Sequence, residues 1–416
     1  MKPARSLFTL VLLGLLVEAA ACSGSSKTES ALPTIAQRSR TSAGAAVLYS
    51  FKGGKDGANP YAGLVAFKGV LYGTTGQGGS ASGNGTVFAI SPTGKERVLY
   101  RFKGGADGMQ PFAGLIAVKG TLYGTTKYGG GSHACGTYGC GTVFALSTSG
   151  KERVVYGFKG GKDGAEPTAS LVAVKGTLYG TTSAGGGASG NGTVFAISAA
   201  GKERVVYRFK GGADGADPEA GLIAVNGLLY GTTRSGGIGN SSAANGNGTV
   251  FRVSTSGKEL VLHTFTGSGY NPDGAQPVGN LINVNGTLYG TTTEGVGIPG
   301  SPGCCGTVFQ ITTSGTESVL YHFTGQPNDG ASPWAGLIAA NGALYGTTDH
   351  GGLNDLGTVF EVSTTGSASI LYSFHGSYGS GFDGLNPVAG LAALNGSFYG
   401  TTQSGGATGN GTVFRL

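Results

Sequence analysis

The chain has few of the residues that characterise most other protein classes. Its 416 residues include one tryptophan, two methionines, five cysteines and 14 prolines, and only 12% are charged. After residue 22, glycine or proline interrupts every window that could form an amphipathic helix, so no helical domain is expected. Scarce proline and the lack of a triplet repeat exclude a collagen-like chain. Apolar residues still make up 39% and recur in register, which argues against disorder.

Glycine is abundant, and a five-residue motif repeats along the chain. The 84 glycines accompany periodic Val, Leu, Tyr, Phe and Thr, a pattern typical of many short strands joined by turns. The sequence Leu-Tyr-Gly-Thr-Thr occurs six times and Phe-Tyr-Gly-Thr-Thr once. Its tyrosines are Tyr72, Tyr123, Tyr179, Tyr230, Tyr289, Tyr345 and Tyr399. A period of about 50 residues in an all-strand pattern indicates propeller blades.

Each repeat contains four strand-like runs, and the two ends of the chain are complementary. The first two runs are always separated by Lys-Gly or Asn-Gly, which favours a hairpin turn with positive φ at both positions. The repeats begin with the fourth type of run, Val47–Phe51, and end with the third type, Thr412–Leu416. An open solenoid would instead need atypical capping repeats. We therefore predict an all-β, seven-bladed propeller over residues 46–416, closed by antiparallel pairing of the N-terminal strand in the last blade.

The repeats resemble a known family. The form LYGTT…GG…GTVF…GxExVLYxF…DGxxP is similar to the GloVer-type tandem repeats of the bacterial "choice-of-anchor" family, and all seven units over residues 46–416 match it. The resemblance implies an envelope or surface protein whose type of anchor varies between members, and it implies no activity. A looser similarity exists to kelch and quinoprotein blades.

The N-terminal region is predicted to direct export. Residues 1–21 have the basic start, apolar run and small residues of a secretory signal. Cys22 resembles the lipobox cysteine of bacterial lipoproteins, although Ala19 stands where leucine is usual. Residues 22–45 are accordingly predicted to be a lipidated cysteine and a flexible tether. Ser23 favours the outer membrane by the same resemblance, facing the periplasm or the cell surface. The alternative is cleavage before Cys22 and secretion.

Two sets of repeated residues are predicted to be structural. The aromatic residues of Gly-Thr-Val-Phe and of the five-residue motif are expected to fill the core between blades. An aspartate before glycine also occurs once per repeat, and it is expected to accept backbone N–H groups of its own turn. A calcium-binding ring is the less favoured alternative. These aspartates are Asp56, Asp107, Asp163, Asp214, Asp273, Asp329 and Asp383.

The candidate ligand-binding residues lie on the variable loops. The loops between fourth and first strands and between second and third strands are expected to share one face, and they differ in length and composition. Each residue that follows a loop proline should enter the innermost strand near the channel mouth. From these we select Tyr61, Phe112, Glu219 and Trp334 as candidate ligand contacts, with the three aromatic residues on one arc of the rim. Packing beneath a neighbouring loop is the alternative for them.

The remaining cysteines and histidines suggest no catalytic centre. Cys135 and Cys140 are expected to form a disulfide within one loop, and Cys304 and Cys305 either a vicinal disulfide or a pair of thiols. The five histidines form no evident triad or metal cluster in the sequence. We therefore predict no cofactor, no metal and no catalytic residue. Quinoprotein enzymes carry a tryptophan in most blades, and this chain has one.

The charge is divided unevenly along the chain. Residues 23–265 contain 24 Lys and Arg against 12 Asp and Glu, whereas residues 266–416 contain one, Arg415, against eight. This asymmetry reflects either duplication of basic units or a field that attracts an acidic envelope partner. We predict a monomeric, lipid-anchored binding or scaffold module that contacts an envelope glycan or protein and no nucleic acid. The alternative is an envelope enzyme, either quinoprotein-like or carbohydrate-active, with its site at the channel mouth.

Overall fold

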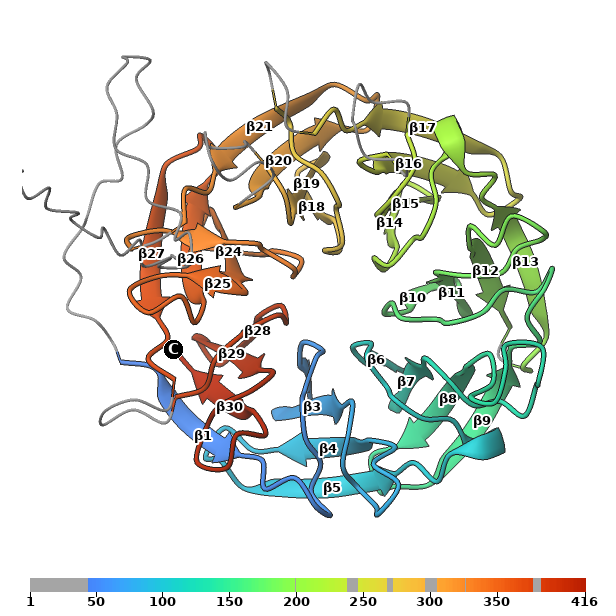
Figure 1. The fold of residues 1–416 in the computed structure, drawn as a ribbon, viewed down its shortest axis with the longest axis horizontal. Helices are drawn as coiled ribbons and strands as arrows, with labels where there is room; N and C mark the ends of the chain where they lie inside the picture. Colours follow the sequence, from blue (N-terminus) through green and yellow to red (C-terminus); the bar gives the residue numbers. More distant parts are fainter. Residues whose placement is uncertain are drawn as a thin grey trace, which may run out of the picture.

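The protein is described by a computed structural model that covers residues 44–198, 200–237, 246–267, 272–295, 305–325, 327–376 and 383–416. It is an all-β ring of seven four-stranded antiparallel blades, which confirms the predicted propeller (Figure 1). Over these residues, helical structure is limited to the short 3-10 turns η1 (Gly105–Asp107) and η2 (Gly212–Asp214). No helix in the described part of the chain has the length and apolar character needed to cross a bilayer.

Each blade runs from a short inner strand to an outer strand on the rim. The first strands are β2 (Val65–Phe67), β6 (Ile116–Val118), β10 (Val172–Val174), β14 (Ile223–Val225), β18 (Ile282–Val284), β23 (Ile338–Ala340) and β28 (Ala392–Leu394). The second strands are β3 (Val70–Thr75), β7 (Thr121–Thr126), β11 (Thr177–Thr182), β15 (Leu228–Thr233), β19 (Thr287–Thr292), β24 (Ala343–Thr348) and β29 (Ser397–Thr402).

The third and fourth strands complete the blades. The third strands are β4 (Thr86–Ile90), β8 (Thr142–Ser147), β12 (Thr193–Ile197), β16 (Thr249–Ser254), β20 (Thr307–Thr312), β26 (Thr358–Ser363) and β30 (Thr412–Arg415). The fourth strands are β5 (Glu96–Arg101), β9 (Glu152–Gly157), β13 (Glu203–Arg208), β17 (Glu259–Thr264), β21 (Glu317–His322), β27 (Ala368–Ser373) and β1 (Ala46–Ser50). The loops of blade six add a pair of two-residue strands, β22 (Gly330–Ala331) and β25 (His350–Gly351).

The ring closes as predicted. Strand β1 pairs antiparallel with β30, and the pairs include Ala46 with Arg415 and Ser50 with Thr412. Phe51, directly after β1, is fully buried in the cluster that joins blades seven and one. The N-terminal strand therefore supplies the outer edge of the last blade.

The first residues of the repeated motif build the core, as predicted. In blade one, Leu71 is fully buried and Tyr72 is buried in the contact with blade two. A Cβ atom on Gly73 would lie 2.6 Å from the Cζ atom of Phe88. Because that distance is too short for any side chain, glycine is required for the aromatic ring of the third strand to pack against the second strand.

The two threonines of the motif hold the blades together by hydrogen bonds. Thr74 Oγ1 donates to the carbonyl oxygen of Ala113 in blade two, at 3.2 Å. Thr75 Oγ1 lies 2.8 Å from Thr86 Oγ1 in the neighbouring strand of its own blade. The same pair of contacts recurs in every blade. Thr401 Oγ1 reaches blade one at the closing junction and donates to the Ala62 carbonyl at 3.2 Å. The motif is therefore repeated because each blade needs the same core and the same bonds to its neighbour.

Two kinds of turn residue adopt positive φ. Lys68 and Gly69 have φ of 50° and 75°, as predicted for the first hairpin, and the other six hairpins follow suit. The residue before each loop proline is also left-handed, which the sequence did not suggest because proline disfavours this conformation in its predecessor. Asn59, with φ of 54°, is one of the seven, and its N–H donates to the carbonyl of Asn410 in the preceding blade. The left-handed conformation therefore occurs where the loop of one blade is hydrogen-bonded to the preceding blade.

Candidate functional site

The two sets of variable loops share one face of the ring, as predicted. In blade one, the loop residue Ala58 forms an antiparallel bridge with Gln77, and Ala275 does so with Glu294 in blade five. Corresponding bridges or the β22–β25 pair join the two loops in all seven blades. The residues that follow the loop prolines are therefore held on this face by backbone hydrogen bonds.

Two of the predicted ligand residues contact each other. The rings of Tyr61 and Phe112 are 4.7 Å apart in an edge-to-face arrangement. A Cβ atom on Gly76 would lie within 3.0 Å of both rings, so the pair covers the backbone of this residue. Tyr61 Oη accepts a hydrogen bond from Gln403 Nε2 at 2.8 Å. We call these four residues the Tyr61 cluster. Both rings are half-buried and pack between blades one and two, and their role as ligand contacts stays a prediction.

The other two predicted residues belong to a second group. Trp334 is 37% exposed, and the guanidinium carbon of Arg234 lies 5.9 Å from the centre of its ring system. Arg234 Nη1 is 3.2 Å from Glu219 Oε1, and Arg234 Nε donates to Gln276 Oε1 at 3.1 Å. Gln276 Nε2 in turn donates to Glu294 Oε1 at 2.5 Å. We call these five residues the Trp334 cluster.

The three aromatic residues therefore belong to two groups of contacts on this face. Tyr61 and Phe112 pair across blades one and two, whereas Trp334 in blade six contacts Arg234 from blade four. Sequence reasoning missed Arg234, although it is the only arginine that directly follows a copy of the repeated motif. Burial raises the pKa of Glu294, with the Arg234 charge opposing it. The Trp334 cluster therefore offers an exposed aromatic face together with charged and amide groups.

The cysteine predictions have two outcomes. Cys135 and Cys140 form the expected loop disulfide, with 5.2 Å between their Cα atoms. Cys304 lies outside the described residues, so the predicted vicinal pair with Cys305 stays a prediction. Cys22 also lies outside the described residues.

A second set of polar groups occupies the outer rim, at the junctions between blades. The repeated aspartates accept backbone N–H groups there, as predicted, but they also bind a side chain of the preceding outer strand. Asp107 accepts from Tyr100 Oη at 2.6 Å and from the N–H of Lys103 at 2.7 Å. The outer strands follow one another around the ring, so Glu152 at the start of the next outer strand joins the same cluster (Figure 1).

These junctions shift the pKa values of their acids. Burial, followed by the charge of Asp107, raises the pKa of Glu152 to about 7. Burial likewise raises the pKa of the equivalent glutamates to about 7; they are Glu96, Glu203, Glu259 and Glu317. Burial and the hydrogen bond to aspartate raise the pKa of the tyrosines, Tyr100 among them. Five junctions therefore contain a glutamate that titrates near neutral pH.

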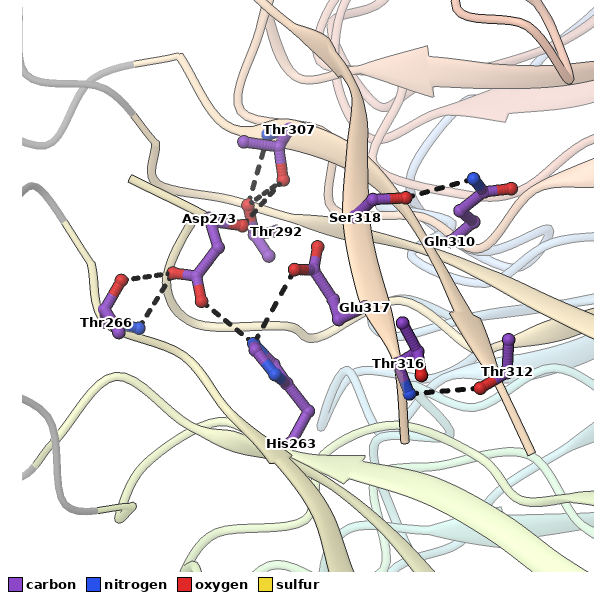
Figure 2. Close-up of polar contacts among 10 residues, drawn as sticks. All are labelled: His263, Thr266, Asp273, Thr292, Thr307, Gln310, Thr312, Thr316, Glu317 and Ser318. Carbon is purple, nitrogen blue, oxygen red and sulfur yellow. Dashed lines mark hydrogen bonds and ion pairs between the residues drawn. The ribbon is translucent and has the colours of Figure 1, made fainter. Parts of the chain in front are cut away.

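The junction of blades four and five replaces the tyrosine with histidine. His263 Nε2 lies 2.9 Å from Asp273 Oδ2 and 4.0 Å from Glu317 Oε2 (Figure 2). Their ligand atoms lie within 4.8 Å of one another, the one group of three or more such residues among those described. This group of potential metal ligands around His263 was not identified from the sequence, and the prediction of no bound metal stays a prediction. Comparing the repeats would have revealed it, because Val-Leu-His-Thr-Phe stands where other repeats have tyrosine.

Comparisons with known proteins agree with the repeat pattern and the fold. A family model described as the Gloeobacter/Verrucomicrobia repeat matches residues 20–244 and 237–416. Among curated proteins, none matches the sequence. PorZ, a surface component of the type-IX secretion system of Porphyromonas gingivalis, is similar in structure with a TM-score of 0.52 and 13% identity. The match covers 88% of this chain and 47% of PorZ.

Two other solved structures are more distantly similar. A luciferin-regenerating enzyme has a TM-score of 0.43 at 12% identity, over 89% of this chain and 95% of that one. A gluconolactonase from Xanthomonas campestris has a TM-score of 0.38 at 13% identity, over 66% and 78% of the two chains. At these identities the likenesses concern the fold alone.

Proposed function

This chain belongs to the Gloeobacter/Verrucomicrobia repeat family, and from that premise we propose that it is a non-enzymatic binding or scaffold propeller at the bacterial cell envelope. Its ligand face is the face of the variable loops. Its N-terminal segment, residues 22–45, is a lipid-anchored tether to the outer membrane that follows a cleaved signal peptide. The ligand is a glycan or a protein of the envelope.

The exposed face of Trp334 is the observation that carries this proposal. It is the only tryptophan in the chain, and 37% of its surface is open to solvent on the variable-loop face. An indole plate with neighbouring carboxylate and amide groups suits a sugar ring or an anchored side chain, because stacking and hydrogen bonding then act together. Arg234, Glu219 and Gln276 supply the polar groups. Truncating such a contact costs about 1–2 kcal/mol of binding free energy.

A binding screen tests the proposal directly. The protein is applied to a glycan array and to envelope fractions, and Trp334→Ala is compared with Trp334→Phe and Leu260→Ala. Leu260 is a matched control because it is 48% exposed but lies on outer strand β17. We expect Trp334→Ala to weaken binding several-fold to thirtyfold with an unchanged Tm, Trp334→Phe to retain most binding, and Leu260→Ala to have no effect. A large loss of Tm in Trp334→Ala, with binding intact, would mean that Trp334 serves only as packing.

The Trp334 cluster also supports a second candidate, a carbohydrate-active enzyme. Three ionisable residues are connected there, since Glu219 pairs directly with Arg234 and Gln276 bridges Arg234 to Glu294. The half-buried Glu294 carboxyl, with its raised pKa, is a candidate proton donor. Glu294→Gln separates the two functions, since it would abolish turnover of a bound glycan while leaving binding nearly unchanged. A ligand that is recovered chemically intact after prolonged incubation with the wild-type protein would exclude this second candidate.

The anchor is tested separately. Cys22→Ala removes the only thiol available for lipidation at the signal cleavage point, so we expect the protein to leave the membrane fraction and appear as a soluble exported protein. Membrane association that persists in Cys22→Ala would remove the anchor from the proposal but not the export.

A further inference from the structure

The junction of blades four and five has a charge balance unlike that of the other six junctions. The first four junctions, from blades seven and one to blades three and four, each contain a rim glutamate. Each also has a lysine directly after the buried phenylalanine that follows the preceding outer strand; these lysines are Lys52, Lys103, Lys159 and Lys210. The last two junctions have neither residue, with Ala368 or Ala45 in the glutamate position. Only the junction of blades four and five keeps the glutamate, Glu317, while Thr266 replaces the lysine.

The same junction brings together three side chains of the types that can ligate a metal ion. His263 comes from β17 of blade four, Glu317 from β21 of blade five, and Asp273 from the loop that connects the two blades. Figure 2 shows all three side chains converging, with both carboxylates facing the His263 ring. Thr266 donates from its N–H and its Oγ1 to Asp273 Oδ1, each at 2.8 Å. Oδ2 is thereby oriented toward His263, as a second hydrogen-bonding layer orients a metal ligand.

Glu317 supplies an independent indication that a cation belongs here. Only 9% of its side chain is exposed, and its Oε1 is buried without a hydrogen-bond partner. Burial of an ionised carboxylate in this condition is costly unless a positive charge compensates it. The corresponding oxygens of Glu96, Glu152, Glu203 and Glu259 are also without partners, but their junctions contain the lysine.

We propose that His263, Asp273 and Glu317 bind a divalent transition-metal ion, with Zn²⁺ as the best match. One imidazole nitrogen and two carboxylate oxygens are ligands that Zn²⁺ accepts, and three protein ligands leave one position for water or an external ligand. Ca²⁺ fits poorly, since it needs six or more oxygen ligands. The ion ties blade four to blade five at the rim. This inference does not depend on the proposed ligand-binding face.

The competing interpretation is a purely structural one. In it, His263 takes the place of tyrosine and donates its Nε2–H to Asp273 Oδ2 without any metal. The two interpretations differ in one measurable respect, because the structural interpretation predicts no dependence on Zn²⁺.

The test is a Zn²⁺ titration of the full chain, purified without a histidine tag, freed of metal with a chelator and treated with an alkylating agent to block thiols. We expect calorimetry to show one site of micromolar or tighter affinity and the Tm to rise with Zn²⁺. Co²⁺ in the site should give visible bands of nitrogen and oxygen ligation without a sulfur-to-cobalt band. His263→Tyr, which restores the residue of the neighbouring junctions and should fold normally, should weaken Zn²⁺ binding at least 100-fold.

Two more variants make the test decisive. Glu317→Gln should also lose the site, so the result does not depend on one substitution. Tyr207→His combined with Lys210→Thr copies the site into the junction of blades three and four, beside Asp214 and Glu259, and should create a second Zn²⁺ site. The proposal is overturned if the wild-type protein binds no Zn²⁺, or if His263→Tyr binds it as tightly as the wild type.

Discussion

The first four junctions of the ring and the last three solve the same packing problem with different charges. In both halves the aspartate accepts a backbone N–H group and a donor from the preceding outer strand, as Asp107 and Asp329 show. The first four add a glutamate and a lysine, whereas the last three lack the lysine and two of them lack the glutamate. The aspartate occurs in all seven junctions and is therefore needed by the fold itself, whereas the glutamate and the lysine are each absent from some junctions and are not. The uneven charge of the sequence arises partly from this difference.

The largest effect is expected where the ring closes, at the pairing of β1 with β30 in blade seven. Deleting residues 46–52 removes β1 and the fully buried Phe51, and leaves β30 as an open sheet edge. Loss of a buried phenylalanine alone costs about 3–5 kcal/mol, a large share of a typical stability. We expect loss of the monomer and association into larger species, measured by size-exclusion chromatography with light scattering. A deletion of residues 30–36, in the predicted tether, is the control and should leave a monomer of normal Tm.

A smaller effect separates the aspartates of the two halves. Asp329 is 1% exposed and accepts from Tyr321 Oη, the Thr324 N–H and Oγ1, and the Gly330 N–H. Asp329→Ala leaves these buried donors without a partner, so we expect a cost of about 3 kcal/mol. Asp107 is more exposed and has fewer partners, so Asp107→Ala should cost about 1–2 kcal/mol in urea unfolding. Equal costs would contradict the proposed difference in burial between the two halves.

The glutamates make the first half sensitive to pH. The folded pKa of Glu152 is about 7, against an ordinary value of 4.5, and the neighbouring charged groups are Asp107 and Lys103. As pH rises from about 4.5 to about 7, the unfolded chain releases this proton before the folded chain does, so the free energy of unfolding falls; above pH 7 it levels off.

We therefore expect Tm to be lower at pH 7.5 than at pH 5, by about 2 °C because these groups are partly exposed. Glu152→Gln removes one of the five raised glutamates, so it should make this slope shallower and raise Tm at pH 7.5, whereas Glu361→Gln, away from the junctions, should change neither. A wild-type Tm that rises over the same interval would refute this prediction.

The smallest effects concern the threonine hydrogen bonds between blades. We expect the bond at the closing junction, between blades seven and one, to contribute as much stability as the bond at any other junction. Thr401→Val removes the hydrogen bond from blade seven to blade one, and Thr181→Val removes the one from blade three to blade four. Each substitution keeps the shape of the side chain and should cost about 1 kcal/mol. Costs that differ by more than about 0.5 kcal/mol, measured in parallel denaturant titrations, would show that the closing junction is packed differently.

The sequence predicted features whose cause lies within one repeat. The motif Leu-Tyr-Gly-Thr-Thr and its turns indicate strands and blades, because strand pairing inside blades one to six is local. Closure is not local, and it was predicted because the two ends of the chain supply the two strand types that complete the seventh blade. The rim clusters were missed because each combines three separate segments, as His263, Asp273 and Glu317 do. The contact of Arg234 with Trp334 was missed for a related reason, since it joins blades that are not consecutive. Such contacts depend on the curvature of the ring and on the reach of side chains.

Closure by β1 also fixes the order in which the fold can be completed. Blades one to six each consist of consecutive strands, so each can form from a stretch of about 50 residues. Blade seven must bring Ala46 to Arg415, the longest separation between paired residues in the structure. The entropy of closing so long a loop is recovered only when the other blades have already curved the chain into a ring. Until β30 has been synthesised, β1 is an unpaired edge strand. A chain that ends before Thr412 can complete six blades but cannot close the ring.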